Sequence, residues 1–263
     1  MKFSDLSYPQ INQLTDKVIV LPIAAIEQHG PHLGVATDTD LVTWIAQKAE
    51  QNLEEDILLC PTLAFGSSHH HLAFGGTISL TINTYTLVIV ELVESMLKSG
   101  FRKIVLLNGH GGNVTPVKQA LAVLGNKYDS DLSPNIALVT YWETAGRVFA
   151  GQAPMESPAL SHACEYETSM MLHIFPNKVW MEKAERPVRP ESNGYIPWED
   201  DEPNRGVTLF KQTQFISSNG SSGEPQLANA EKGKHLLENA AASITDFLKS
   251  FKNWPLSKDL SKK

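Results

Sequence analysis

Cysteine is scarce in this chain, which has only Cys60 and Cys164 among its 263 residues. Two cysteines cannot build the disulfide framework that holds small secreted domains together. The beginning of the chain, MKFSDLSYPQINQL, also lacks the apolar segment that a secretory signal peptide requires. We therefore expect reduced thiols and a cytoplasmic protein.

Long hydrophobic runs are missing as well. The most apolar stretch, residues 86–98, is interrupted by Glu91 and Glu94, whereas a membrane-spanning helix needs about 20 predominantly apolar residues in a row. Positive charge is in the minority, with 22 Lys and Arg against 29 Asp and Glu and a formal net charge of −7. The sequence thus predicts neither a membrane partner nor the basic surface by which proteins bind nucleic acids.

The chain does have enough apolar sequence for a full core, at 42% of its residues. Short apolar runs predict strands over 17–24, 56–65, 75–82 and 135–142, and RKIVLLNGHGGN (102–113) predicts a strand followed by a glycine-rich turn. Helical spacing predicts helices over 39–52, 83–101, 114–128, 164–176 and 228–253. This alternation is typical of an α/β fold with a mainly parallel sheet and helices on both faces.

Polar residues and glycine mark the expected helix ends. We expect Asp38 or Thr39 to cap the helix over 39–52, Asn83 or Thr84 to cap the helix over 83–101 and Gly100 to end it, and Asn113 to cap the helix that follows it.

Residues 186–225 are rich in Pro, Gly, Ser and Asn and predict an irregular excursion, which is either a lid over a site or a surface loop. No linker separates two foldable halves, so residues 1–263 are expected to form a single domain.

The segment EQHGPHLGVATDTD places acids and imidazoles directly after the first predicted strand. Glu27 and His29 are two positions apart, so an extended segment directs both side chains to one face, and Asp38 can fold back toward them from the next helix. Buried charges need compensation, and imidazoles with carboxylates suit Zn, Mn or Fe(II). The segment therefore predicts a metal site, with a solvated polar loop and a capping Asp as the alternative.

The turn NGHGGN (108–113) follows another predicted strand, at the edge where open parallel sheets bind ligands. Its glycines let the backbone approach a ligand closely, and His110 lies among them. Together with the preceding motif, it predicts one shared metal site. The alternative is a phosphate-binding turn of a nucleotide-binding module, but no G-x-G-x-x-G spacing and no Lys-Ser/Thr pair supports it.

Two further segments carry histidines. In SHACEYETSMM, His162 precedes Glu165 and Glu167, which diverge by about 200° on a helix, so only one of the two acids is expected to face the pocket of His162. The alternative is that both acids only stabilise the helix N-terminus. The tract HHH (69–71) predicts a loop that lines the site, with His71 behind the ligands, or a plain exposed loop.

Four segments in the same order, EQHGPHLGVATDTD, FGGTISL, NGHGGN and HACEYETSMML, resemble the creatininase (creatinine amidohydrolase) family. The closing SSGEPQLANAEKGK is similar to a further segment of the family. The resemblance implies a three-layer α/β/α fold, two divalent ions (zinc, manganese or both, with iron as an alternative) and hydrolysis of a non-peptide C–N amide bond. The implied substrate is creatinine or a related small amide, and the implied assembly is a homo-oligomer such as a hexamer.

The resemblance also implies a role for each candidate residue by its position in the motifs. Glu27, Asp38 and His110 would hold one ion, and His29 and Asp38 would hold the second, with Asp38 as the bridge. His162 lies at the position of the family's catalytic histidine and would donate a proton to the leaving nitrogen.

The remaining candidates concern the water and the substrate. Glu165 or Glu167 would help to activate a water between the ions. Trp142 is similar to one of two tryptophans that shield the substrate, and His71 and Gly111 are further candidates for binding it.

The sequence departs from creatininase itself at several positions. Gly111 and Gly112 replace a Tyr and a metal-binding Glu, so the second ion lacks a ligand, and we hypothesise that Glu167 supplies it. Pro158 lies near the position of the second tryptophan, Ser161 replaces an acid, and Gly75 replaces a proline. These differences are similar to the branch that contains the formamidopyrimidine-nucleotide deformylases. A deformylase and a non-catalytic metal-binding scaffold are therefore the alternatives.

Overall fold

Four parallel strands form the central sheet of the computed structural model, which describes residues 1–129, 132–191, 206–258 and 260–261. The strands are β1 (Val18–Ile23), β2 (Ile57–Leu59), β3 (Lys103–Asn108) and β4 (Asn135–Thr140), in the order β2-β1-β3-β4. The register aligns Ile19 with Ile104 on the central pair of strands. Strand β1 is apolar and buried along its whole length, which is typical of a parallel strand that is covered on both faces.

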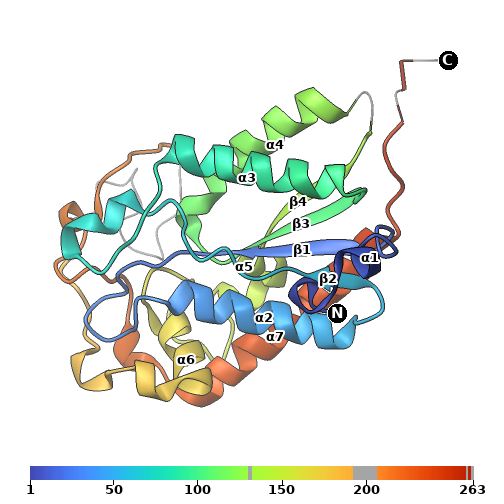
Figure 1. Cartoon of the computed structure of the whole chain (residues 1–263). Coiled ribbons are helices and arrows are strands. Elements are labelled where there is room, and N and C mark those ends of the chain that lie inside the picture. Colours follow the sequence, from blue (N-terminus) through green and yellow to red (C-terminus); the bar gives the residue numbers. More distant parts are fainter. Residues whose placement is uncertain (130–131, 192–205, 259, 262–263) are drawn as a thin grey trace.

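Helices cover both faces of this sheet (Figure 1). The helices are α1 (Tyr8–Ile11), α2 (Thr37–Asn52), α3 (Ile82–Lys98), α4 (Val114–Tyr128), α5 (Tyr141–Ala145), α6 (Glu165–Ile174) and α7 (Ala230–Lys252). Helices α3 and α4 pack on one face around Ile89 and Val117, and α2 and α7 pack on the other around Ile45 and Leu237, with α6 beside α7. The predicted three-layer α/β/α fold is confirmed.

Two of the predicted strands are wrong in their extent. Residues 75–82 form no strand: Ile78 makes an isolated bridge with Ile26, Leu80 donates a backbone hydrogen bond to Gly66, and Ile82 begins α3. The physical reason is that Gly75 and Gly76 have φ angles of 78° and 65°, which an extended strand does not adopt. The strand predicted over 56–65 is reduced to β2 because Pro61 lacks the amide hydrogen that a continuing ladder requires.

Two predicted helix caps lie at other residues, and a third lacks its side-chain bond. Helix α2 begins at Thr37, with Ala36 as its N-cap, so Asp38 lies inside the first turn and is free to face the site. The N-cap of α3 is Thr81, whose hydroxyl accepts from the N–H of Thr84 at 3.2 Å. Asn113 occupies the N-cap position of α4, as predicted, but its side-chain amide accepts from Ser67 N and donates to Ala24 O and makes no capping bond.

The excursion predicted over 186–225 is irregular where the structure describes it, with short 3-10 turns such as η7 (Thr213–Phe215). Residues 192–205 of this excursion lie outside the described residues. Among the described helices, none has both the length and the apolar character that crossing a membrane requires.

Candidate metal centre

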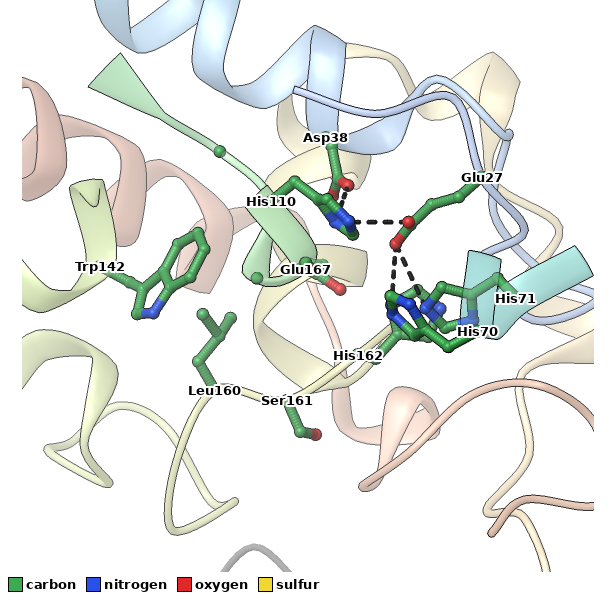
Figure 2. Close-up of a pocket in the computed structure, with 13 residues that line it drawn as sticks. Glu27, Asp38, His70, His71, His110, Trp142, Leu160, Ser161, His162 and Glu167 are labelled. Atoms are coloured by element: carbon green, nitrogen blue, oxygen red, sulfur yellow. Dashed lines mark ion pairs between the residues drawn. The ribbon is translucent and has the colours of Figure 1, made fainter. Parts of the chain in front are cut away.

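Residues that follow all four strands meet beyond the carboxyl edge of the sheet. Glu27 follows β1, His70 follows β2, His110 follows β3 and Trp142 follows β4. They surround a cavity of about 270 Å³ (Figure 2). Its lining residues are Glu27, Asp38, His70, His71, Gly109, His110, Gly111, Gly112, Trp142, Leu160, Ser161, His162 and Glu167.

The Asp38 carboxylate lies between two imidazoles. Its Oδ1 is 3.1 Å from Nε2 of His29, and its Oδ2 is 3.1 Å from Nδ1 of His110. The early start of α2 causes this placement because it brings the side chain of Asp38 into the first helical turn. A carboxylate with one oxygen toward each imidazole has the arrangement that a ligand bridging two ions requires.

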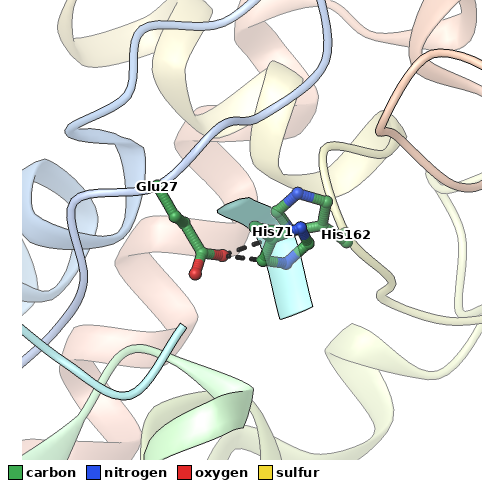
Figure 3. A group of neighbouring side chains, drawn as sticks. All are labelled: Glu27, His71 and His162. Carbon is green, nitrogen blue, oxygen red and sulfur yellow. Dashed lines mark ion pairs between the residues drawn. The ribbon is translucent and has the colours of Figure 1, made fainter. Parts of the chain in front are cut away.

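Glu27 connects the His110 side of the cavity with the histidines opposite. Its Oε2 is 3.3 Å from Nδ1 of His110 and accepts a hydrogen bond from the hydroxyl of Ser68. Its Oε1 faces His71 Nε2 and His162 Nδ1, each at 3.5 Å (Figure 3). Glu27 is buried, so these contacts provide the compensation that a buried carboxylate needs.

Glu167 is the acid of α6 that faces the cavity. Its Oε2 is 3.9 Å from His29 Nε2 and accepts the backbone N–H of Ala163 at 2.5 Å. Ala163 has a φ of 52°, a left-handed conformation that costs a non-glycine residue about 1 kcal/mol. This turn places His162 and Glu167 on the same side of the cavity. Of the pair Glu165 and Glu167, only Glu167 lines the cavity, as expected.

Glu165 does not belong to the cavity, which corrects its prediction as a catalytic residue. Its carboxylate accepts from Lys232 Nζ and from Ser157 N, both at 2.6 Å. All of these groups are buried on the α7 side of α6. The physical reason is the helical period that separates Glu165 from Glu167, together with a buried cation on α7 that pairs with Glu165.

Burial dominates the electrostatics of the cavity, since a charge removed from water loses its hydration. Burial raises the pKa of Glu27, and it raises the pKa of Glu167 to about 7. Burial also acts to raise the pKa of Asp38, but His29 and His110 outweigh it and hold that pKa below its usual range. Burial acts to lower the pKa of His29, but the negative charge of Asp38 outweighs it and raises that pKa to about 10. Positive charge in the middle of the cluster would therefore stabilise the ionised forms of these acids.

The donor atoms fit divalent metal ions. Sets of three ligand atoms lie within 4.8 Å of one another, and carboxylate oxygens with imidazole nitrogens suit zinc and manganese. Asp38 Oδ2 is buried, and the contact of 3.1 Å with His110 Nδ1 lacks hydrogen-bond geometry, so this oxygen has a lone pair available for an ion. The sets are Glu27–His29–Asp38, Glu27–His70–His110, His29–His162–Glu167 and Glu27–His71–His162.

His29 also has the orientation of a ligand. Its Nδ1 lies 3.1 Å from the backbone oxygen of Glu27, and donation to that oxygen fixes the ring and leaves Nε2 directed at Asp38 and Glu167. Such an outer hydrogen bond is typical of histidines that bind metals.

His162 and His71 stack against each other, with ring centroids 4.2 Å apart. Nε2 of His162 lies 2.9 Å from the backbone oxygen of Gln28 and 3.0 Å from the side-chain nitrogen of the same residue. In the tautomer with hydrogen on Nε2, the ring donates to that backbone oxygen. Burial and then the neighbouring imidazoles lower the pKa of His162 well below its ordinary value and that of His71 to about 2. A lowered pKa favours the neutral form of each ring.

Sequence reasoning did not single out several residues of this site, including Leu160, His70 and the adjoining Gln28. His70 lines the cavity, and its ring stacks on that of His110 at 5.9 Å. The HHH tract was the available signal, but it favoured His71. No sequence motif singled out Gln28. In the structure, its side-chain amide donates to Gly220 O at 2.8 Å and contacts His71 Nδ1 at 2.6 Å. The predicted residues Trp142 and Gly111 both line the cavity.

Comparisons with known proteins agree with this arrangement. The creatininase family profile, described as creatinine amidohydrolase, matches residues 4–248. A mycofactocin precursor peptide peptidase from Mycobacterium tuberculosis is 30% identical over 249 residues, which cover 91% of this chain and 86% of the relative. A 3-dehydro-scyllo-inosose hydrolase from Thermotoga maritima is 27% identical and covers 94% of this chain and 80% of its own length.

Solved structures share the fold over nearly the whole chain. A creatinine amidohydrolase crystal structure aligns with a TM-score of 0.80 at 22% identity, covering 97% of this chain and 98% of the other. Creatininases in a zinc–zinc form and in a manganese form align with TM-scores of 0.78 and 0.76, at 22% and 23% identity, over 96% of this chain and 98% and 99% of theirs. The extent of the family match shows that this chain belongs to the creatininase family of hydrolases.

Proposed function

We propose that this protein is a metal-dependent amidohydrolase that uses water to cleave a C–N amide bond. The observation that carries the proposal is the position of Asp38, with one carboxylate oxygen 3.1 Å from His29 and the other 3.1 Å from His110. Buried carboxylates of Glu27 and Glu167 flank this pair of contacts.

We assign two divalent ions to these donors by combining the contacts of Asp38, Glu27 and Glu167 with the two imidazoles. Glu27, Asp38 and His110 would hold one ion, and His29, Asp38 and Glu167 would hold the other. When bound, such ions lower the pKa of water and polarise the carbonyl group of a substrate. The zinc–zinc and manganese forms of related structures support zinc or manganese, with iron as an alternative.

His162 is the proposed proton carrier. Hydrolysis gives the carbonyl carbon a hydroxyl group and breaks the C–N bond, and the nitrogen leaves with a proton. In its neutral form, the ring can accept the proton that the attacking water loses and return it to the leaving nitrogen. In the tautomer that donates from Nε2 to the Gln28 carbonyl, Nδ1 is the atom that exchanges the proton. This refines the predicted role, in which His162 only donates.

Trp142 and Leu160 form an apolar side of the cavity, away from His70 and His71 (Figure 2). An indole there can pack on a planar amide and keep bulk water from it. A cavity of about 270 Å³ suits a reacting group the size of creatinine or a formamide.

One relative points to a second candidate class of substrate. The name of the 30% identical mycobacterial relative describes a peptide peptidase, so a peptide amide is a candidate beside the non-peptide C–N bonds of creatinine and heterocyclic formamides. The proposed chemistry is the same for all three classes, and the residues that surround the cavity decide among them.

The test is a metal and substrate survey of the purified protein. Elemental analysis should give about two equivalents of zinc, manganese or iron, which chelation removes and metal addition restores together with activity. Creatine, formate and newly formed amino groups are then measured separately on creatinine, on formamides and on short peptides. Metal binding without hydrolysis of any of these amides would favour the non-catalytic scaffold, and a protein that binds no divalent ion would refute the proposal.

A further inference from the structure

A second and larger cavity adjoins the candidate metal centre. It measures about 740 Å³, against about 270 Å³ for the first. The two cavities share His70, Gly111 and Gly112 as lining residues. The metal-centre cavity is below the usual range for a small-molecule site, which is roughly 300–1,000 Å³, whereas the second cavity lies within it.

The two shared glycines differ in what a side chain would meet. A Cβ on Gly112 would lie 2.3 Å from Ser67 O and 2.4 Å from His110 Nε2, so only glycine fits there. A Cβ on Gly111 would meet no atom within 4 Å, and the backbone at this position accepts any L residue. The missing side chain at Gly111 therefore leaves open space where the two cavities meet.

The lining of the second cavity combines neutral polar residues with apolar ones and one cation. The polar residues are Ser67, His69, His70, Thr81, Asn83 and Thr115. Ile82 of α3 and Leu209, Phe210 and Ile216 of the irregular segment supply apolar side chains, and Lys211 supplies a positive charge. Among the described residues that line it, none is Asp or Glu. Phe210 packs edge-on against His70, with ring centroids 6.3 Å apart, which connects this wall to the metal centre.

We propose that the second cavity binds an extended apolar arm of the substrate, and that this arm ends in a carboxylate near Lys211. The scissile amide lies in the metal-centre cavity, and the arm passes Gly111. This inference rests on the proposed amidohydrolase function for the position of the amide, while the cavity and its charge are independent of that function. Gly111 would then determine which substrates the enzyme accepts.

The first experiment measures binding alone. The probe is 4-phenylbutanoate, titrated by calorimetry into the protein as purified. We expect Lys211→Glu to weaken binding about threefold, the scale of an exposed ion pair, and Phe210→Ser to weaken it at least as much. The matched controls are Lys234→Glu and Phe215→Ser, which alter exposed residues outside the cavity and should not change the affinity. No binding, or equal affinity in all of these variants, would overturn the proposal.

The second experiment measures turnover against arm length. One series, HOOC–(CH2)n–CO–NH2, releases ammonia, and the other, HCO–NH–(CH2)n–COOH, releases formate. We expect kcat/KM to rise with n in one series. Gly111→Leu should lower the ratio of kcat/KM for the longest member to that for the shortest by about tenfold, and Ile82→Trp, which fills the cavity from α3, should do the same.

The two experiments separate the failure of this inference from the failure of the proposed function. Hydrolysis that does not depend on n, or a ratio that both variants leave unchanged, would overturn the inference and leave the amidohydrolase proposal intact. Binding of the probe that depends on Lys211 and Phe210, without hydrolysis of any amide, would uphold the second cavity as a ligand site and refute the amidohydrolase proposal.

Discussion

The ring of His162 is held by the backbone of Gln28, a residue 134 positions earlier in the chain, through a contact of 2.9 Å between Nε2 and the carbonyl oxygen. Because Gln28 lies between the candidate ligands Glu27 and His29, this bond fixes the proposed proton carrier against the metal centre. The other ring nitrogen then faces Glu27 Oε1 at 3.5 Å, and about a fifth of the side chain, 22%, remains exposed.

Replacing His162 should separate catalysis from metal binding. We expect His162→Asn to keep its metal content and to lose activity by about 10²- to 10⁴-fold, the usual contribution of a general acid–base group. Steady-state kinetics and elemental analysis on the same sample provide the measurement. His235→Asn, on the exposed side of α7, is the control that should retain full activity. An active His162→Asn protein would remove this residue from the mechanism.

Asp38→Asn should remove both ions, because both proposed sites include this carboxylate. The expected metal content falls from about two equivalents to near zero by elemental analysis. Asp40→Asn is a close control, since Asp40 is two residues away in the same helical turn and pairs with Lys178 at 2.6 Å instead. Two equivalents of metal on the Asp38 variant would show that the bridge is assigned to the wrong residue.

Glu167→Gln should affect the two ions unequally. The Glu167 carboxylate lies 3.9 Å from His29, the proposed ligand of one ion, whereas His110, the proposed ligand of the other, contacts Glu27 at 3.3 Å. We expect about one equivalent of metal to be lost and one to be retained, together with most of the activity being lost. Retention of both ions after dialysis against a weak chelator would disprove the hypothesis that Glu167 replaces the glutamate that the glycine turn lacks.

Glu165→Gln should act on stability and leave the metal content unchanged. Removing Glu165 leaves Lys232 with the exposed Glu156, 2.8 Å away, as its counter-charge. The expected cost is about 2 kcal/mol in the free energy of unfolding at pH 7, the scale of one hydrogen bond to a charged group. Burial raises the pKa of Glu165, but hydrogen bonds from Lys232 and Ser157 outweigh it and lower that pKa below its usual value of 4.5. The carboxylate therefore stabilises the fold above about pH 4.5, and this contribution is lost as the pH falls through the folded-state pKa.

Urea unfolding of this variant and of the wild type at a series of pH values measures the effect. The difference between the two proteins should be largest near neutral pH and should shrink on acidification below the usual carboxyl range. A difference in unfolding free energy that stays constant with pH would mean that the charge of Glu165 does not contribute to stability. Loss of metal from the variant would mean that Glu165 affects the metal centre.

The sequence by itself determined the family and predicted most of the acids and imidazoles that meet in the cavity. Apolar strands buried on both faces, and polar motifs directly after them, suffice to predict a parallel sheet with a site at its carboxyl edge. Glu27 and His110 could be assigned in this way because each immediately follows a strand. The local signals failed at 75–82, where strand-like residues follow two glycines with positive φ.

Only the tertiary structure decided which residues of an ambiguous pair belong to the site. Glu165 and Glu167 are equivalent in sequence, and Lys232, which is 67 residues away from Glu165, determines that Glu165 is buried in an ion pair. The contact of Gln28 with His162, the place of His70 and the second cavity at Gly111 likewise depend on packing between distant segments. Such contacts follow from how the helices and the irregular segment lie on the sheet, and no local pattern of residues encodes that placement.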